Sequence, residues 1–342
     1  MNIKLATDKD QQDWDAYVWN HPDAVAYHQF AWGQSISKAY GFAPTYLMAE
    51  KNHQIVGILP LIRLKIPLWG SQLVSLPYCD LGGPLSDDDK TREGLLNFAV
   101  ELAKDNGDKN LELRQTATPG QTTTVKKVRM ILPLPASSEA LMAGFKAKLR
   151  SQVKKPTKDG LTAQLGGKEL LDDFYRVLAV NMRDLGSPVH SFNWFAAIAE
   201  YYQDHVRIGL VRSPDSKVIA AGIILLHKQV VSIPWASTLR DYNRLSPNML
   251  LYWTFLSFAA DNGFQSFDFG RSTPDEGTYK FKQQWGAQPQ PLSWRQIPEG
   301  ELNRNVQNGP SSARLMVEKL WQKLPVAVAN RVGPLLRRFI SL

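Results

Sequence analysis

Val74-Ser75-Leu76-Pro77 recurs later in the chain as Val231-Ser232-Ile233-Pro234, and Asp105-Asn106-Gly107 recurs as Asp261-Asn262-Gly263. The two offsets, 157 and 156 residues, nearly agree, and such agreement favours duplication of a half-chain unit. A chain of 342 residues is long enough for two domains. The repeat therefore predicts two similar domains in tandem.

Both halves show the same order of expected elements. Apolar spacing predicts a helix over residues 30–40 and another over 192–202, and an Asn-Gly pair ends a longer helix in each half. The first half then has strands at 46–49, 55–64, 72–76 and 111–114 and its longer helix at 92–104; the second has strands at 206–211, 218–226, 230–234 and 266–269 and its longer helix at 248–260. Mixed sheets flanked by helices predict the α+β class, with domains over 1–127 and 128–300 and a tail over 301–342.

The net charge of +8 is unevenly distributed. Residues 121–158 contain nine basic residues and one acidic residue, and residues 301–342 contain seven basic and two acidic residues. The first block includes an expected strand at 128–134 and an expected basic helix at 138–155. Such asymmetry favours an anionic partner, namely RNA, lipid headgroups or a phosphorylated substrate, although a solvated basic face is the alternative.

Several classes of protein are excluded by composition and by missing motifs. Cys79 is the single cysteine, which excludes a disulfide framework and a multi-thiolate zinc site and fits a reducing compartment. The first residues lack the apolar core of a signal peptide. His227-Lys228-Gln229 interrupts the longest apolar stretch, which predicts two strands and a turn and not a membrane span. The sequence has no His-x-x-x-His pair and no Walker, G-x-G-x-x-G or G-x-S-x-G motif, so we expect no metal. Residues 283–288 are the nearest match to a coenzyme A pyrophosphate loop, but the match fails at Gln288.

The most informative stretch runs from Phe267 to Gly286. A strand ends in the turn Gly270-Arg271-Ser272, and a flexible loop with Pro274 and Gly277 is expected next. A cluster of aromatic and basic side chains follows: Tyr279, Lys280, Phe281, Lys282 and Trp285. Cations beside aromatic rings at the end of a strand favour an anion-binding site.

This stretch resembles the FemAB-related family, in particular the branch associated with exosortase and exopolysaccharide systems. Three further stretches are similar to the family's pattern: residues 78–84, residues 149–155 with Gly160-Leu161, and residues 182–188. The resemblance covers about residues 25–300. It implies two GNAT-like (acyl-CoA N-acyltransferase-like) domains in tandem, in agreement with the duplication.

The resemblance also implies an activity, namely transfer of an acyl or aminoacyl group to an amine of a bacterial cell-envelope precursor, in peptidoglycan or exopolysaccharide. The expected cosubstrate is aminoacyl-tRNA or acyl-CoA, with no tightly bound cofactor. Residues 150–190 are too few for the helical hairpin that some relatives carry for tRNA contact. The expected partner is an anionic, phosphorylated or lipid-linked precursor, and the expected location is the cytoplasm or the inner face of its membrane.

Candidate site residues follow from the chemistry that the resemblance implies. Lys282, with Lys280 and Arg271, is a candidate for binding phosphate or the oxyanion. Asp80 and Asp268 are candidates for positioning or deprotonating the amine, and ordinary turn aspartates are the alternative. The other candidates for binding substrate are Ser272, Tyr279, Phe281, Trp285, Arg240, Tyr242, Arg150 and Arg183.

Two apolar stripes at helical spacing occupy the tail, one from Ser312 to Leu324 and the other from Val328 to Ile340. Pro325 separates them, and Gly333-Pro334 is expected to interrupt the second. Such basic amphipathic helices either lie in a membrane interface or pack on the protein. Two other functions remain open at this point, a CoA-dependent sugar-amine acetyltransferase and a non-catalytic RNA- or membrane-binding module.

Overall fold

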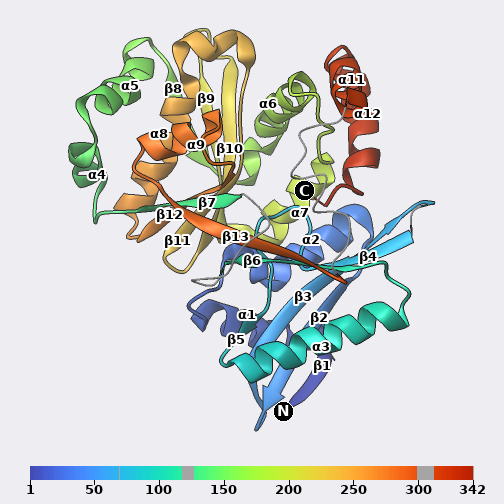
Figure 1. Cartoon of the computed structure of the whole chain (residues 1–342). Coiled ribbons are helices and arrows are strands. Elements are labelled where there is room, and N and C mark those ends of the chain that lie inside the picture. Colours follow the sequence, from blue (N-terminus) through green and yellow to red (C-terminus); the bar gives the residue numbers. More distant parts are fainter. Residues whose placement is uncertain (69, 118–126, 299–311, 342) are drawn as a thin grey trace. The chain divides into compact units, whose positions relative to one another are not determined.

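Each of two units in the chain is a mixed sheet flanked by helices (Figure 1). The computed structural model describes residues 1–68, 70–117, 127–298 and 312–341. Unit 1 comprises Met1–Lys126, Pro291–Gly309 and Arg338–Leu342, and unit 2 comprises Lys127–Gln290 and Pro310–Arg337. Strand β13 (Gln288–Ile297) therefore returns the chain from unit 2 to unit 1.

In unit 1 the strand order is β1-β2-β3-β4-β6-β13, and β5 pairs with β3. Strands β4 and β6 are parallel, and the pairs β1–β2, β2–β3, β3–β4 and β6–β13 are antiparallel. The strands are β1 (Asn2–Ala6), β2 (Pro44–Lys51), β3 (Gln54–Ile66), β4 (Gly70–Val74), β5 (Leu85–Ser86) and β6 (Leu111–Thr116). The helices are η1 (Asp8–Asp10), α1 (Gln11–Asn20), η2 (Ala26–His28), α2 (Phe30–Tyr40) and α3 (Asp89–Asp105).

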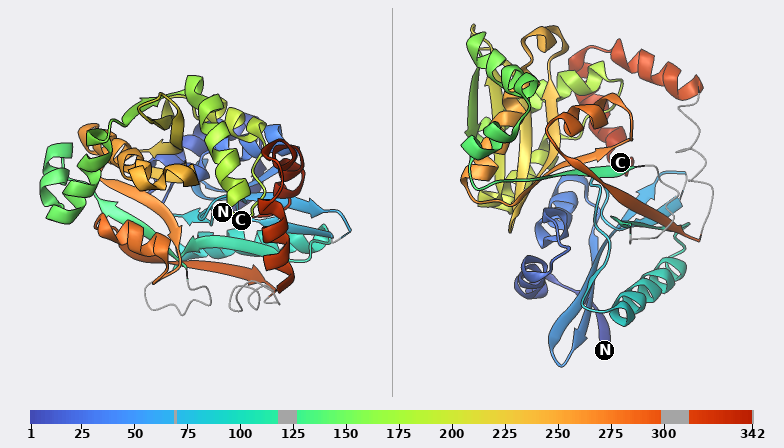
Figure 2. Two further views of the ribbon diagram at one scale, coloured as in Figure 1. Left: turned by 90° about the horizontal axis from the view of Figure 1, so that it is seen from above. Right: turned by 60° about the vertical axis from the view of Figure 1, so that its left-hand side comes forward.

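Alternate residues of the strands in unit 1 build two cores. On β2, Leu47 and Ala49 pack with Leu95 and other buried residues of α3, whereas Tyr46 and Met48 belong to a second cluster with residues of α1 and α2. Side chains of a strand point alternately to the two faces of its sheet. Helix α3 therefore covers one face, and α1 with α2 covers the other (Figure 2).

In unit 2 the strand order is β7-β12-β11-β10-β9-β8, with β11 and β12 parallel and the other pairs antiparallel. The strands are β7 (Val128–Pro133), β8 (Thr162–Gly166), β9 (Val206–Arg212), β10 (Val218–His227), β11 (Val230–Thr238) and β12 (Ser266–Ser272). The helices are α4 (Ser138–Gly144), α5 (Ala147–Lys158), η3 (Lys168–Leu170), α6 (Leu171–Asp184), α7 (Phe192–Tyr202), η4 (Gln203–His205), η5 (Arg240–Leu245), α8 (Pro247–Asp261), α9 (Gly277–Gln284), α11 (Ser312–Gln322) and α12 (Val326–Arg337).

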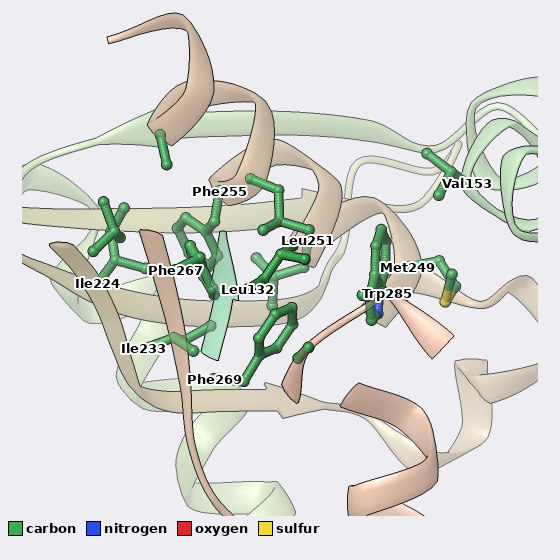
Figure 3. Packing of buried hydrophobic residues seen from close by; sticks show 14 of the residues in the cluster. Leu132, Val153, Ile224, Ile233, Met249, Leu251, Phe255, Phe267, Phe269 and Trp285 are labelled. Atoms are coloured by element: carbon green, nitrogen blue, oxygen red, sulfur yellow. The ribbon is translucent and has the colours of Figure 1, made fainter. Parts of the chain in front are cut away.

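Helix α8 packs on one face of the sheet of unit 2. Its Leu251 and Phe255 share a cluster with Phe267 and Phe269 of β12, and Trp285 extends this core beyond α9 (Figure 3). Helices α6 and α7 also contact the sheet, and the ring of Phe195 on α7 lies 5.0 Å from that of Trp235 on β11. The core thus fixes the position of β11 relative to both helix layers.

Three local expectations are wrong, each for a packing reason. The basic helix divides into α4 and α5, because Phe145 turns into the core and meets Trp285 with ring centres 5.6 Å apart. The expected flexible loop after Pro274 contains a helix, α9, whose Lys282 and Trp285 are buried. Helix α12 continues through Gly333-Pro334, where Gly333 packs closely on Val189. Within the described residues, the helices are too short or too polar to cross a bilayer.

Candidate functional site

Strand β11 carries a bulge at the proline of the repeated motif. Opposite β10, Trp235 pairs with Ile223 and Ser232 pairs with Leu225, so Ile233 and Pro234 together face the single residue Ile224. A bulge accommodates a proline inside a strand, because the extra residue leaves the ladder where the missing N–H would be needed. The strand expected to end at Pro234 therefore continues to Thr238.

The bulge coincides with the end of the pairing between β11 and β12. Their parallel register runs from Val230–Ser266 to Ser232–Asp268, whereas β11 goes on for six more residues to Thr238. Beyond the bulge, β11 still pairs with β10 on its other edge. In the described residues, the edge of β11 that faces β12 therefore makes no strand pairing with β12 from Pro234 onward.

A cavity of about 540 Å³ lies along this part of β11. Its lining comes from five helices and one strand, and all of it belongs to unit 2. The lining residues are Asn181, Asp184 and Leu185 at the end of α6; Ala236, Ser237 and Thr238 of β11; Arg240 and Asn243 of η5; Asn248, Leu251 and Tyr252 of α8; Phe281 of α9; and Gln322 of α11. This volume suits a small-molecule ligand or one arm of a larger one.

One end of the cavity favours negative charge. The exposed guanidinium-bearing residue Arg240 lines it together with Asn248, the second residue of α8. Helix α8 begins at Pro247 after Ser246, which has a left-handed backbone, and its 15 residues give it a full helix dipole. The positive end of a helix beside an arginine is a natural place for a phosphate or carboxylate.

The α6 side of the cavity supplies a carboxylate. Asn181 Nδ2 donates to Ser237 Oγ at 3.1 Å, which ties α6 to β11. One turn further on, Asp184 lines the cavity and accepts a hydrogen bond from Arg183 Nε at 2.6 Å. Arg183 also donates from its guanidinium to the carbonyl of Leu324, 3.1 Å away. Asp184 is therefore held by Arg183, which is itself fixed by the Leu324 carbonyl.

Aromatic rings form the apolar part of the lining. Tyr252 stacks on Phe269 with ring centres 5.6 Å apart and meets Phe281 edge-on at 5.0 Å. Burial raises the pKa of the Tyr252 phenol to about 12. The phenol is therefore protonated at neutral pH and remains a hydrogen-bond donor.

The comparisons with known proteins point to the same part of the chain. Residues 143–283 match the family model described as acetyltransferase (GNAT) domain. Unit 2 contains a GNAT domain. The match covers less than half of the chain, and no curated protein matches it in sequence.

The GNAT domain lies within a fold shared with several solved structures. FemX aligns over 86% of this chain and 95% of its own, at 15% identity and a TM-score of 0.66. The C-terminal domain of a putative lysylphosphatidylglycerol synthetase from Agrobacterium fabrum aligns over 83% and 91%, at 14% identity and 0.56. A tandem GNAT protein from the clavulanic acid biosynthesis pathway aligns over 88% and 100%, at 10% identity and 0.53. The predicted tandem GNAT-like fold, as in FemX, is confirmed at the level of the fold, and the GNAT match supports an acyltransferase.

Of the site residues predicted from sequence, Arg240 and Phe281 line the cavity of the GNAT domain. Lys282 and Asp268 do not line it. Lys282 is buried, and its Nζ donates to the carbonyls of Gly270, at 3.1 Å, and Arg271, at 2.7 Å. Asp268 is buried too, paired with the Arg129 guanidinium at 2.9 Å and accepting from the Gly270 amide at 2.8 Å.

Most of the other predicted residues lie on β12 or α9, or are half-buried elsewhere outside the cavity lining. Ser272 and Trp285 are buried, Arg271 and Tyr279 are half-buried, and Lys280 is exposed. The Tyr242 hydroxyl accepts from Lys217 Nζ at 3.1 Å, and Arg150 donates to the Phe145 carbonyl. Arg183 contacts the cavity only through Asp184. Asp80 belongs to unit 1, where its carbonyl accepts from Trp294 Nε1 at 3.1 Å.

Sequence reasoning missed Asp184, Asn181 and Tyr252. Asn181, Asp184 and Leu185 are spaced as neighbours on one face of a helix, and Asp184 lies within the stretch 182–188 that carries the family resemblance. This spacing is the signal that was available. Within the described residues no group of three metal-binding side chains occurs.

The repeated motif in unit 1 forms a closed turn. Leu76 and Tyr78 have left-handed backbones, and the fully buried Arg114 donates to the Cys79 carbonyl at 2.8 Å and to Leu76 O at 3.5 Å. Arg114 also pairs with Glu112, with 2.6 Å between guanidinium nitrogen and carboxylate oxygen. Burial raises the pKa of the Cys79 thiol, so this cysteine is not an activated nucleophile.

Proposed function

We propose that this protein is an N-acyltransferase or aminoacyltransferase of the FemAB type that acts on an amine of a cell-envelope or exopolysaccharide precursor. The observation that carries the proposal is the cavity beside the bulged strand β11, whose lining lies within the GNAT match except for Gln322, with Arg240 at one end and Asp184 on one wall. FemX and the lysylphosphatidylglycerol synthetase domain are the neighbours that support an envelope substrate.

The donor site lies between β11 and the start of α8. The strand edge at Ala236–Thr238 offers backbone groups to an extended acyl-bearing chain, as an added strand would use them. Arg240 and the N-terminus of α8 bind the donor's phosphate. Acyl-CoA and aminoacyl-tRNA both carry phosphate, but in acyl-CoA the pantetheine arm separates it from the thioester, whereas in aminoacyl-tRNA a single ribose separates it from the ester. The length of the donor's arm is therefore what distinguishes the two donors at this site.

The amine attacks the acyl carbon, the bond to the donor's sulfur or oxygen breaks, and the amine loses one proton. Asp184 is the cavity carboxylate placed to accept that proton, and it passes the proton to solvent. The leaving sulfur or oxygen takes up a proton from solvent, and the Tyr252 phenol, which keeps its own proton because burial raises its pKa, donates a hydrogen bond to it. Lys282 and Asp268 act as positioning residues that hold the end of β12 and the helix carrying Phe281.

Donor binding tests the first half of this proposal. Arg240→Ala is compared with Arg244→Ala, which removes the same charge from the same short helix at a residue outside the cavity. Because hydrogen bonds to charged groups contribute about 1.5–3 kcal/mol, we expect Arg240→Ala to weaken acyl-CoA or aminoacyl-tRNA binding by about tenfold or more. Isothermal titration with each donor measures it. Equal affinities for the two variants would remove Arg240 from the donor site.

Turnover tests the second half. Asp184→Asn is compared with Asp172→Asn, an exposed carboxylate on the same helix. Loss of a general base costs about 100-fold or more in rate, whereas donor affinity is expected to stay unchanged. Single-turnover acyl transfer to a small amine measures both. Full turnover by Asp184→Asn would contradict the assignment of Asp184.

A CoA-dependent acetyltransferase acting on a sugar amine is the second candidate, favoured by the GNAT match itself. A thermal shift produced by acetyl-CoA but not by aminoacyl-tRNA would favour it over aminoacyl transfer. We also propose a cytoplasmic location, with tail residues 312–342 near the inner face of the membrane, since both donors are made in the cytoplasm and the single cysteine fits a reducing compartment.

A further inference from the structure

The two C-terminal helices of unit 2 expose an unusual amount of apolar surface. Eight large apolar side chains on them are between 39% and 62% exposed: Leu315, Met316, Val317 and Leu320 on α11, and Val328, Val332, Leu335 and Leu336 on α12. On α12 these residues recur at spacings of four, three and one, which places them on one face. An exposed apolar face of this kind marks an interaction site.

These faces are not the ones that attach the helices to the rest of unit 2. Trp321, Ala329 and Gly333 are buried, and a Cβ at Gly333 would lie 3.1 Å from the Val189 nitrogen. On α11, Glu318 packs against Gly186, since a Cβ at that glycine would lie 2.9 Å from the Glu318 carbonyl oxygen. These contacts attach the helices to unit 2. The exposed leucines, valines and methionine take no part in that attachment.

The charges around the apolar faces are almost all positive. Lys319, Lys323 and Arg331 are exposed beside them. Glu318 is the single acidic residue from 312 to 342, and it is half-buried on the packed side. An apolar face bordered by lysine and arginine is the pattern of a helix lying in the interface of an anionic bilayer. A second copy of this chain would bring the same cations together, which disfavours self-association.

We propose that α11 and α12 dock the protein on an anionic lipid membrane, with Met316, Leu320 and Leu335 entering the interface. The helices also border the cavity, because Gln322 of α11 lines it and Arg183, which holds Asp184, binds the carbonyl of Leu324 between the two helices. If the proposed acyltransfer holds, α11 contributes both to the docked surface and, through Gln322, to the cavity, which favours a lipid-linked acceptor. The docking itself does not depend on that activity.

Co-sedimentation of the full chain with vesicles tests the docking. We expect binding to vesicles of equal parts phosphatidylglycerol and phosphatidylcholine, weaker binding as salt rises, and little binding to phosphatidylcholine alone. The double variant Met316→Asp/Leu320→Asp should lose at least tenfold in affinity, and Lys319→Gln/Lys323→Gln should lose affinity for the anionic vesicles. Leu68→Asp, at a fully exposed leucine of unit 1, is the control and should bind as the unmodified protein does.

Equal sedimentation of the Met316→Asp/Leu320→Asp variant and the control would overturn the proposal. So would a concentration-dependent dimer, measured by analytical ultracentrifugation, that this double variant dissociates, because the face would then join two copies. Circular dichroism and the melting temperature establish that each variant is folded. Acyl-CoA titration without vesicles separates the two proposals, since docking variants should bind the donor normally even when they no longer sediment.

Discussion

The same four-residue motif has opposite outcomes in the two units. In unit 1, Val74 ends β4, and the following residues turn sharply around the buried guanidinium of Arg114. In unit 2, Val231 lies inside β11, and the proline produces a bulge after which the strand continues beside a cavity. The surroundings of the proline differ between the units. In unit 1, Arg114 binds the carbonyls of the loop after the motif. In unit 2, β11 stays paired with β10 on both sides of the bulge.

Each unit also buries one ion pair on the strand that pairs in parallel with the motif. Glu112 on β6 pairs with Arg114 two residues away, whereas Asp268 on β12 pairs with Arg129 on β7. Ser75 N donates to the Glu112 carbonyl, and Ser232 is the register partner of Asp268. In unit 1 the Arg114 guanidinium also binds carbonyls of the turn. In unit 2 the Arg129 guanidinium links β7 to β12 through Asp268.

The largest expected effect is on the turn of unit 1. Arg114→Ala leaves Glu112 buried without its cation and removes the donor to the Cys79 carbonyl, so we expect a loss of about 3–5 kcal/mol in the free energy of unfolding. Urea unfolding followed by tryptophan fluorescence measures it. Lys104→Ala breaks the pair with Glu101, in which both side chains are 66% exposed, and should cost about 1 kcal/mol or less. Similar losses in the two variants would contradict the role given to Arg114.

A somewhat smaller effect is expected from the packing of the same turn. A Cβ at Gly82 would lie 2.6 Å from the Ser75 carbonyl oxygen, so Gly82→Ala should destabilise the protein by about 1–3 kcal/mol. Gly144→Ala is the matched control, because a Cβ there meets nothing within 4 Å. Differential scanning calorimetry compares the two variants. An unchanged melting temperature for Gly82→Ala would show that the turn is looser than its contacts indicate.

In unit 2, Lys282 tests whether the end of β12 is held by a buried cation. Lys282→Met keeps the length of the side chain but leaves the Gly270 and Arg271 carbonyls without this donor, at a cost of about 1–3 kcal/mol. Because Lys282 positions the helix that carries Phe281, donor affinity should fall while the single-turnover rate of bound donor stays nearly constant. A loss of rate without a loss of affinity would instead favour direct catalysis by Lys282.

The smallest expected effect is a pH dependence in unit 2. Burial, with repulsion from Arg337, holds the pKa of His190 well below its usual value of 6.5. The unfolded chain therefore binds a proton below about pH 6.5 that the folded chain does not, and stability falls as pH drops, by about 1 kcal/mol between pH 6.5 and 5.5. His190→Gln should remove this difference when urea unfolding is measured at pH 7.5 and 5.5. An identical pH dependence in both proteins would exclude His190 as the group responsible.

The repeat and the helix stops predicted two similar α+β domains, and the family resemblance implied that these are GNAT-like. The helix stops were predictable because they depend on local chemistry. Asn-Gly ends a helix wherever the chain places it, and α2 and α7 have the predicted bounds. The destinations of Lys282 and Asp268 could not be predicted in this way. The sequence pattern of a lysine near aromatic residues is the same whether its ammonium binds a ligand or backbone carbonyls. The packing of α9 on β12 determines that Lys282 binds two carbonyls.

The cavity was harder to predict than the fold, for a related reason. Arg240 and Phe281 were predicted because of charge and aromatic character, whereas Asp184 reaches the cavity only because α6 lies against β11 through Asn181. Likewise, Pro234 in an apolar run predicted the end of a strand. The strand continues because β11 forms a bulge opposite β10, and the sequence of β11 alone does not show that pairing.

Pro234 also affects whether the unpaired edge of β11 promotes aggregation. An edge without a partner strand invites pairing with another polypeptide and so promotes aggregation. Proline has no N–H to offer such a strand, and the kink it causes breaks the straight run of hydrogen-bonding groups that an intruding chain would need. Pro234, two residues before the part of β11 that lines the cavity, therefore also protects this strand edge against misassembly.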